Sequence, residues 1–136
     1  RLGLDARPGD LASIRRWFAD WKTDAFISRC LDLAGRTRLA EAVDLLSLAT
    51  AVVSNDSGLM HIAAALARPL VVVYGATSPD FTPPLSDNAA IVASDIDCAP
   101  CFQRECPLGH HGCMRYTPME RVAQELETLL AREAPG

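Results

Sequence analysis

Short apolar runs alternate along the chain with longer segments in which apolar residues have helical spacing. The apolar runs predict four strands, at residues 31–34, 51–54, 70–74 and 90–93. The run 70–74 reads Leu-Val-Val-Val-Tyr, and an unbroken apolar run is typical of a parallel strand that is covered on both faces. The first of the four strands is expected to end at Gly35.

Helical spacing predicts four helices, each with one apolar face. The apolar positions are Leu11, Ile14, Phe18 and Trp21; Leu39, Ala42, Val43 and Leu46; Leu59, Ile62, Ala63 and Leu66; and Val122, Leu126 and Leu129. Asp10 and Thr37 are the predicted caps of the first two helices. In the last helix, over 117–132, Thr117 at the cap, Pro118 at the first position and Glu120 at the third predict a capping box.

This alternation of strands and helices predicts an α/β fold, with a Rossmann-like parallel sheet and flanking helices. Residues 31–136 would form a partial nucleotide-binding domain of this kind, and residues 1–30 an unassigned N-terminal helical segment. In such sheets, ligands bind outside the carboxyl ends of the strands. Two loops are expected to leave carboxyl ends, at 55–58 and 75–80, so candidate functional residues are sought there.

The first of these loops leads directly into a helix. A helix N-terminus carries unpaired backbone N–H groups and a partial positive charge. If Asp56 or Ser57 is the cap, the N–H groups of Gly58, Leu59 and Met60 point outwards. Gly58 has no Cβ, so a phosphate group could approach the backbone closely. The segment is therefore a candidate anion site.

Two side chains beside this helix start could add to such a site. His61 lies on the same side of the helix as Ser57 and can donate to a phosphate oxygen or a sugar hydroxyl. Asp56 would repel a phosphate, so it is expected to hold backbone N–H groups or a ribose hydroxyl. The alternative is that these residues are ordinary caps and that His61 is a surface histidine. Thr77 and Ser78, in the second loop, either line the same site or serve as turn residues.

Composition narrows the class of protein. The chain has 136 residues, enough for one domain with a core, and a net charge of -4 with Lys and Arg spread along it. A broad nucleic-acid-binding surface is therefore not expected. The sequence has neither a signal peptide nor an apolar run that could cross a bilayer, which predicts a cytoplasmic location. Arg15 and Arg16 could still contact an anionic membrane surface.

Four of the five cysteines fall in the window 98–113, at Cys98, Cys101, Cys106 and Cys113. The spacing of Cys98 and Cys101 suits a tetrahedral zinc site, and the other two could complete four thiolate ligands. His110 or His111 could replace one of them. The alternatives are free thiols and disulfides. Cys30 lies outside the window and is expected to be a buried apolar residue.

Several segments, read in order, resemble the ADP-heptose:lipopolysaccharide heptosyltransferases, with the heptosyltransferase II subfamily as the nearest match. The segments are 33–37, 39–42, 54–65, 68–71, 74–75, 78–85 and 98–110. The matched segments in this order are specific, although Ser-Asn-Asp-Ser-Gly, at residues 54–58, would not be specific alone. The resemblance covers roughly three quarters of the chain, from about residue 31 to the last helix.

The resemblance implies a GT-B glycosyltransferase, in which two Rossmann-like domains face each other across a cleft. This chain would be part of the C-terminal, donor-binding half. The family's Asp-(Ser/Thr)-Gly-Leu-x-His motif maps onto Asp56, Ser57, Gly58, Leu59 and His61, which would hold the diphosphate of ADP-heptose. The implied reaction is an inverting transfer of heptose to the lipopolysaccharide inner core, on a heptosylated Kdo-lipid A acceptor. It requires no cofactor, so a zinc ion at the cysteines would be structural.

The family's N-terminal acceptor domain, with its general-base aspartate, has no counterpart in this sequence. The loop bearing Lys or Arg that opens the C-terminal domain is missing as well. The chain is therefore expected to be a fragment that binds donor without catalysing transfer alone. Two other functions are considered: a non-catalytic interaction module stabilised by zinc, and a GT-B glycosyltransferase that uses another nucleotide sugar.

Overall fold

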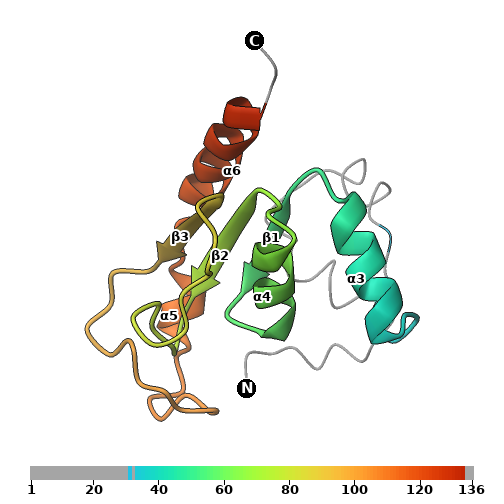
Figure 1. Cartoon of the computed structure of the whole chain (residues 1–136). Helices are drawn as coiled ribbons and strands as arrows, with labels where there is room; N and C mark the ends of the chain where they lie inside the picture. Colours follow the sequence, from blue (N-terminus) through green and yellow to red (C-terminus); the bar gives the residue numbers. More distant parts are fainter. Residues whose placement is uncertain (1–30, 32, 134–136) are drawn as a thin grey trace. The chain divides into compact units, whose positions relative to one another are not determined.

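The computed structural model describes residue 31 and residues 33–133 (Figure 1). The predicted helix around Asp10, the Arg15–Arg16 pair and Cys30 lie outside the described residues. The chain divides into two compact units, residues 1–42 and 43–136, and the whole sheet belongs to the second. The elements are α3 (Leu39–Leu48), β1 (Val52–Asn55), α4 (Gly58–Ala65), β2 (Leu70–Tyr74), β3 (Ala89–Ala93), α5 (Gly112–Arg115) and α6 (Met119–Glu133).

The three strands form a parallel sheet in the order β1-β2-β3. Val71 of β2 stands opposite Val53 of β1 and Ala90 of β3. The connection from β1 to β2 runs through α4, whereas residues 75–88 join β2 to β3 without a helix. The predicted α/β fold with a parallel sheet is thus confirmed, and three of its four predicted strands are present within a residue of their expected bounds.

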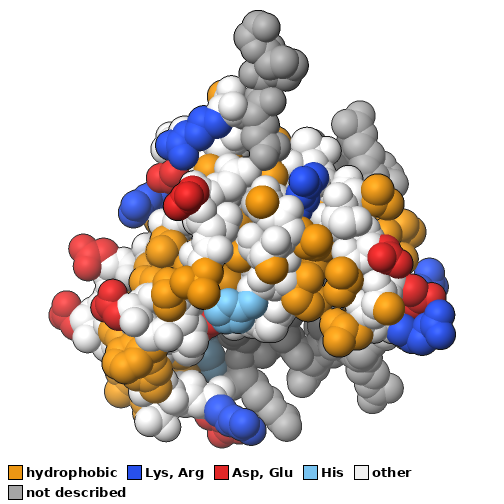
Figure 2. All heavy atoms as spheres, viewed as in Figure 1, with side chains coloured by type: hydrophobic (Ala, Val, Ile, Leu, Met, Phe, Trp, Pro, Cys, Tyr) orange, Lys and Arg blue, Asp and Glu red, His pale blue; other side chains and the backbone are white. Residues whose placement is uncertain are grey.

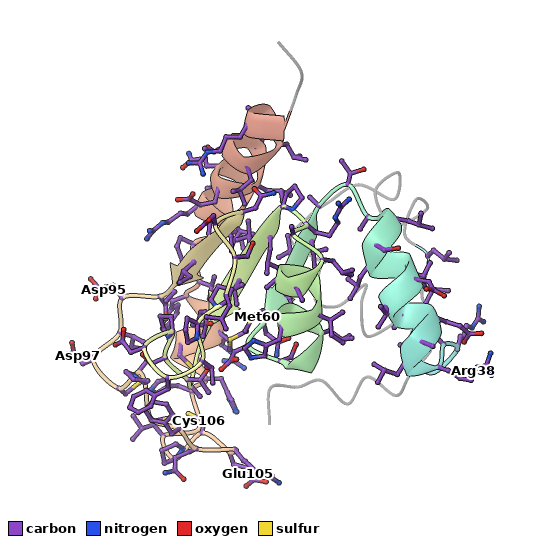
Figure 3. All side chains as sticks on the ribbon, in the orientation of Figure 1. Arg38, Met60, Asp95, Asp97, Glu105 and Cys106 are labelled. Carbon is purple, nitrogen blue, oxygen red and sulfur yellow. The ribbon has the colours of Figure 1, made fainter. Side chains whose placement is uncertain are left out.

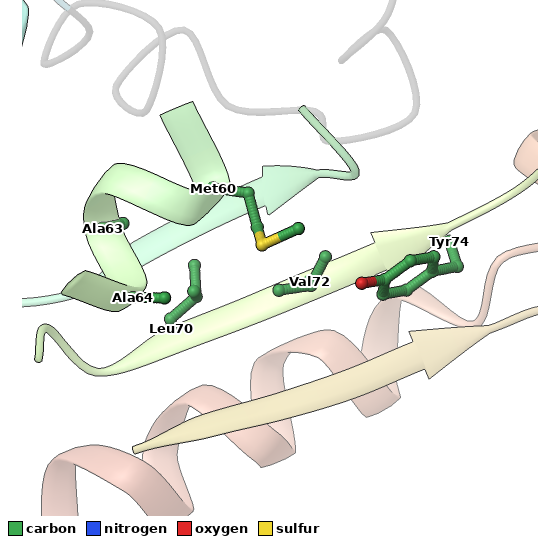
Figure 4. Close-up of a cluster of buried hydrophobic side chains, with 6 residues drawn as sticks. All are labelled: Met60, Ala63, Ala64, Leu70, Val72 and Tyr74. Carbon is green, nitrogen blue, oxygen red and sulfur yellow. The ribbon is translucent and has the colours of Figure 1, made fainter. Parts of the chain in front are cut away.

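One face of the sheet packs against α4 (Figure 4). Alternate residues of β2, which are Leu70, Val72 and Tyr74, are fully or almost fully buried there. The residues that meet them from α4 are Met60, Ala63 and Ala64. The predicted inner face of this helix was therefore partly wrong, because Leu59 is 44% exposed and Met60 takes the central place. Small alanines let the helix lie close to the strands.

The opposite face of the sheet is covered by α6 (Figure 1). Val71 and Val92 of the strands pack against Val122 and Leu129, and Leu126 lies partly buried beside them. The predicted inner face of the last helix is confirmed. Burial of β2 on both faces explains its unbroken apolar run, as the sequence predicted.

The strand expected at 31–34 is absent from the described residues. Residues 34–36 instead form a turn in which the Arg36 N–H donates to the Leu33 carbonyl at 3.0 Å. Gly35 adopts the left-handed conformation, with φ 71°, that this turn requires. The turn hydrogen bond takes up the Leu33 carbonyl, which would otherwise have been available to a strand ladder.

The caps of two helices also differ from expectation. Helix α3 begins at Leu39, which puts Arg38 at the cap, and the Arg38 N–H donates to the Glu41 carboxylate at 2.8 Å. This hydrogen bond lowers the pKa of Glu41. Helix α6 begins at Met119, and the Thr117 hydroxyl donates to the Cys113 carbonyl at 3.2 Å. The predicted capping box of Thr117 is therefore not formed, because its hydroxyl is used within the preceding turn.

Helix α5, a single turn at Gly112–Arg115, was not predicted. It is too short to show helical spacing in the sequence, and His111 before it adopts the left-handed conformation with φ 52°. Among the described helices, none has both the length and the apolar character needed to cross a membrane.

Candidate functional site

The start of α4 is open on its outer side. Of the two candidate caps, Asp56 and Ser57, the structure has Ser57 as the N-cap, with an extended backbone at φ −160°. Its side chain makes no capping hydrogen bond, because its hydroxyl faces the Ser54 hydroxyl at 3.4 Å. A Cβ placed on Gly58 would meet nothing within 4 Å. The backbone of the first helical residue is therefore open on the side where a Cβ would stand, so a ligand can approach it closely there.

Asp56 lies between this helix start and the loop that follows β2. Its carboxylate accepts a hydrogen bond of 2.8 Å from the Thr82 hydroxyl. The Thr82 carbonyl in turn accepts a hydrogen bond from the Tyr74 hydroxyl. Burial raises the pKa of Tyr74, and the negative charge of Asp56 raises it further. The expected partners of Asp56 were backbone N–H groups or a ribose hydroxyl, and the partner found in the chain is a threonine hydroxyl.

Ser78 organises the loop after β2. Its carbonyl accepts hydrogen bonds from the N–H groups of Phe81 and Thr82, and its hydroxyl accepts one from the Asp80 N–H at 3.2 Å. Ser78 is only 8% exposed, so it is held inside the turn. Of the two loop residues singled out in the sequence, Ser78 therefore has the role of a turn residue.

A pocket of about 290 Å³ opens beside Asp56. It is lined by Asp56, Thr77, Phe81, Thr82 and Phe102. The rings of Phe81 and Phe102 meet edge to face, with centroids 5.2 Å apart. Thr77 thus lies in the pocket wall, which was one of the two roles that the sequence left open for it.

Phe102 reaches the pocket from the cysteine window. Its N–H donates to the Ala76 carbonyl at 2.7 Å, which joins the window to the loop after β2. Phe102 is 51% exposed and Phe81 is 75% exposed, although both are large apolar side chains. In the space-filling view, hydrophobic side chains gather on the side of the molecule where these loops lie (Figure 2). Exposed aromatic rings in a pocket wall are available to a ligand.

The pocket is lined by one aspartate, two threonines and two phenylalanines, and its exposed surface is almost entirely apolar. Nucleosides and sugars have apolar faces that suit such a lining. Of the motif residues expected at the site, Asp56 lines the pocket, whereas Gly58, Leu59 and His61 are exposed on α4.

Sequence reasoning missed three of the lining residues, Phe81, Thr82 and Phe102. The first two could have been found from their position in a loop after a strand's carboxyl end. Phe102 could not have been found in this way. It is held beside the pocket by a hydrogen bond from its N–H to the carbonyl of Ala76, which lies 26 positions earlier in the chain.

The four cysteines of the window are half-buried free thiols. The Cys98 sulfur lies 3.9 Å from His110 Nε2, and His110 Nδ1 accepts a 2.8 Å hydrogen bond from the Gly112 N–H. The Cys113 carbonyl accepts hydrogen bonds from the Ser94 and Thr117 hydroxyls. Side-chain contacts thus hold the window near its two ends, at Cys98 and at Cys113.

The thiols differ in their surroundings. Hydrogen bonds from the backbone N–H groups of His111, Leu108, Gly109 and His110 lower the pKa of Cys106. Burial raises the pKa of Cys113, and so do the charges of Cys101, Cys106 and Cys98. Within residue 31 and residues 33–133, no set of three or more Cys, His, Asp or Glu side chains is already placed to hold a metal ion.

Comparison with known proteins gives consistent results. The model of glycosyltransferase family 9 (heptosyltransferase) matches residues 14–111. Lipooligosaccharide heptosyltransferase 2 of Haemophilus influenzae is 67% identical over 104 residues, which are 76% of this chain and 30% of that protein. Lipopolysaccharide heptosyltransferase 2 of Escherichia coli is 45% identical over the same shares of the two chains.

A solved structure agrees with these relatives. The structure of the E. coli ADP-heptose lps heptosyltransferase II superposes with a TM-score of 0.68 at 39% sequence identity. The match covers 93% of this chain and 35% of that one. The chain therefore spans about 30% of the length of the curated relatives it matches.

Proposed function

The chain belongs to glycosyltransferase family 9, the heptosyltransferases, and on that premise we propose that it is the donor-binding part of an inverting transferase. The parent enzyme moves heptose from ADP-heptose to the inner core of lipopolysaccharide. Residues 31–136 form its partial Rossmann-like nucleotide-sugar-binding domain, which includes the cysteine window.

The observation that carries this proposal is the open start of α4 beside the pocket at Asp56. The diphosphate of the donor binds at the N–H groups of Gly58 and Leu59, where the partial positive charge of the helix favours an anion. The absence of any atom within 4 Å of a Cβ at Gly58 supports this placement. His61 is exposed one turn further along and donates to a diphosphate oxygen.

The adjoining pocket holds a hydroxyl-bearing part of the same donor. Asp56 accepts hydrogen bonds from its hydroxyl groups, while Thr77 and Thr82 add polar contacts. Phe81 and Phe102 cover an apolar face of the ligand. This division keeps the Asp56 carboxylate off the diphosphate, which it would repel.

The chemistry follows from where charge develops. During transfer the bond between the sugar and the diphosphate breaks, and negative charge grows on the departing phosphate oxygen. Hydrogen-bond donors already aimed at that oxygen stabilise the transition state more than the ground state. The N–H groups of α4 and His61 have this role in the proposed enzyme.

No cofactor takes part in the transfer, and a zinc ion at the cysteines would be structural. The acceptor is the lipopolysaccharide inner core, which places the enzyme in the cytoplasm, peripherally at the inner membrane of a Gram-negative bacterium. Nucleic acid is not a partner.

The proposal is tested by calorimetric titration of the chain with ADP, UDP and GDP. ADP is expected to bind best, and His61→Ala is expected to weaken ADP roughly ten-fold or more, because a hydrogen bond to a charged group is lost. Gln124→Ala, which also removes an exposed polar side chain from a helix, serves as the matched control and should leave binding unchanged.

The other outcomes separate the rival functions. Preference for UDP or GDP would identify a glycosyltransferase with another donor. Failure of all three nucleotides to bind, in a folded chain that takes up zinc, would favour the zinc-stabilised interaction module. Equal ADP binding by His61→Ala and the unsubstituted chain would remove His61 from the site.

A further inference from the structure

The hydrogen bond between Thr82 and Asp56 differs from the contact that an aspartate in this position usually makes. Asp56 stands two residues before Gly58, and an aspartate side chain commonly accepts the backbone N–H groups two or three residues further on. Among the described residues, its carboxylate instead accepts the hydroxyl of Thr82, 26 positions later in the chain, at 2.8 Å. A distant partner has thus replaced the local ones.

We propose that Thr82 is a positioning residue for the donor site: it holds the Asp56 carboxylate away from the first N–H groups of α4, so that the diphosphate can bind there. This inference rests on the proposed function, because it takes the start of α4 as the diphosphate site. A carboxylate turned towards the helix start would occupy those donors and repel a second anion. Thr82 acts through Asp56 and does not itself need to touch the diphosphate.

The start of α4 has the form that this role requires. Ser57 is the N-cap but makes no side-chain capping hydrogen bond, since its hydroxyl lies 3.4 Å from that of Ser54. In the described part of the chain, the two side chains best placed to cap the helix, those of Asp56 and Ser57, are thus turned to other partners. The first N–H groups of the helix are thereby left to a ligand.

Thr82 offers its hydroxyl from a backbone that is fixed on both sides. Its N–H donates to the Ser78 carbonyl at 3.3 Å, and its own carbonyl accepts the hydroxyl of Tyr74. Two prolines follow it directly, and their rings restrict the backbone at that point. Because Tyr74 is only 1% exposed, the loop is anchored to the core. The direction in which Thr82 holds the Asp56 carboxylate is therefore set before a ligand arrives.

The hydroxyl of Thr82 has two acceptors within reach. The Asp56 carboxylate lies at 2.8 Å and the Ser78 carbonyl at 3.4 Å. A hydroxyl has one proton to donate, and the shorter contact to a charged acceptor is the stronger hydrogen bond. Thr82 therefore donates to Asp56. A serine in its place could make the same hydrogen bond, whereas a valine of nearly the same shape could not.

Asp56 is the acidic residue whose direction matters to the site, because it lines the pocket and is half-buried. Asp95, Asp97 and Glu105 are exposed and extend outwards into solvent (Figure 3), and Asp80 is exposed as well. Water and salt screen exposed charges more strongly than a half-buried one. Control of the Asp56 carboxylate is therefore the control that an anion at α4 needs.

The test uses pyrophosphate, which has the diphosphate of the donor but neither its hydroxyl groups nor its base. Affinity is measured by NMR titration, followed at the amides of Gly58 and Leu59. Thr82→Val should weaken pyrophosphate about ten-fold, because the freed carboxylate turns to the helix start. Thr82→Ser keeps the hydroxyl and should stay within about two-fold of the unsubstituted chain. The opposite order of the two variants would mean that the threonine methyl group matters and not the hydroxyl, which would overturn the proposal.

Thr128→Val is the matched control. It also removes a threonine hydroxyl that donates to an oxygen, in this case the Gln124 carbonyl at 2.8 Å, but from an exposed position on α6. Its affinity for pyrophosphate should equal that of the unsubstituted chain. The comparison separates the loss of the Thr82 hydroxyl from a general effect of replacing threonine with valine.

A double-mutant cycle shows whether Thr82 acts through Asp56. Asp56→Ala alone should bind pyrophosphate at least as tightly as the unsubstituted chain, because a nearby negative charge is gone. Adding Thr82→Val to Asp56→Ala should then change nothing, since no carboxylate remains to be held. A loss on Thr82→Val that is the same with and without Asp56 would overturn the proposal, because the threonine would then act by another route.

The direction of the carboxylate is also measured without a ligand. Three-bond NMR couplings of Asp56 report its χ1 rotamer, which should be single in the unsubstituted chain and in Thr82→Ser, and changed or averaged in Thr82→Val. An unchanged rotamer in Thr82→Val would overturn the proposal. If neither pyrophosphate nor ADP binds the unsubstituted chain, the proposed function fails and this inference with it. If they bind the unsubstituted chain and Thr82→Val equally, the proposed function stands and only the role of Thr82 is lost.

Discussion

Asp56 is connected to the interior of the fold through Thr82 and Tyr74. Its carboxylate accepts the Thr82 hydroxyl, and the Thr82 carbonyl accepts the Tyr74 hydroxyl, which comes from the buried strand β2. The position of a candidate ligand-binding carboxylate is therefore supported by Thr82 from a neighbouring loop and by Tyr74 from a strand. Such support limits the rotamers open to the carboxylate before a ligand arrives.

The first prediction uses the effect of Asp56 on Tyr74. Tyr116→Phe leaves Tyr74 as the only tyrosine, so that ultraviolet titration reports its phenol alone. Burial and the Asp56 charge raise its pKa, so the midpoint should exceed about 10, the usual value. Adding Asp56→Asn should bring the midpoint down. An unchanged midpoint would mean that the two side chains are not coupled.

This shift also gives the sign of a stability effect. Because the folded-state pKa of Tyr74 is raised, the stabilisation from its neutral phenol is complete below the unfolded value. It is lost as the pH rises through the folded value. Urea unfolding of the Tyr116→Phe variant should therefore show a decline in stability that begins near pH 10.

A second prediction at the residue scale concerns Phe102. Phe102→Ala should weaken binding of the donor by about 0.5–1.5 kcal/mol, because the substitution removes one aromatic ring from the pocket wall. Leu108→Ala, in the same cysteine window but outside the pocket lining, is the matched control. Calorimetry with ADP and with ADP-heptose separates the two parts of the ligand. If Phe102→Ala weakens binding of ADP-heptose but not of ADP, the ring contacts the sugar. If Phe102→Ala and Leu108→Ala bind both ligands with equal affinity, the ring contacts neither ligand.

At the scale of elements, β2 is the strand that both layers share. Helix α4 covers Leu70, Val72 and Tyr74 on one face, and α6 packs on Val71 from the other. Removing a side chain from either helix leaves a cavity against β2, so stability should depend on both helices.

Leu129→Ala tests this dependence on the α6 side. Leu129 is 2% exposed, so its truncation should lower the free energy of unfolding by about 2–5 kcal/mol in urea. Leu85→Ala is the control, because Leu85 is 83% exposed and its truncation should cost under about 0.5 kcal/mol. Similar losses in both variants would contradict the packing of α6 on the sheet.

The elements also show which features could be predicted from sequence. Strand β2 and helix α6 were found because their patterns are local and long enough to be distinct, as for Val122 and Leu129. The strand at 31–34 was wrong because a short apolar run carries no information about a partner strand. The pocket wall at Phe102 was missed because it depends on a contact between segments far apart in sequence, which no local period encodes.

On the scale of the whole molecule, the candidate site is assembled at one end of the parallel sheet. The loops after β1 and β2 meet there, and the cysteine window joins them through Phe102. The pocket beside Asp56 lies at the end of the sheet where the general rule for α/β sheets predicts a ligand. It could not predict the composition of the pocket.

The last prediction concerns the chain as a unit of function. Since it spans about 30% of the length of its curated relatives, the 136-residue chain should bind ADP without transferring heptose. The measurement is an ADP-release assay with donor and acceptor, set beside the calorimetric titration. Turnover at a rate above that of a chain with Asp56→Asn and His61→Ala would show that the matched region carries the catalytic groups as well.

The connection from β2 to β3 has a further consequence. Residues 75–88 carry Thr77, Phe81 and Thr82, yet the pairing of the two strands depends on buried residues such as Val71 and Val92. The residues of this connection that line the pocket are therefore different from the residues that hold the two strands together. Substitutions in residues 75–88 can therefore change which ligand the pocket accepts while the buried residues of the two strands stay the same. Residues 75–88 are therefore the first segment to substitute in an attempt to alter the ligand preference of the pocket.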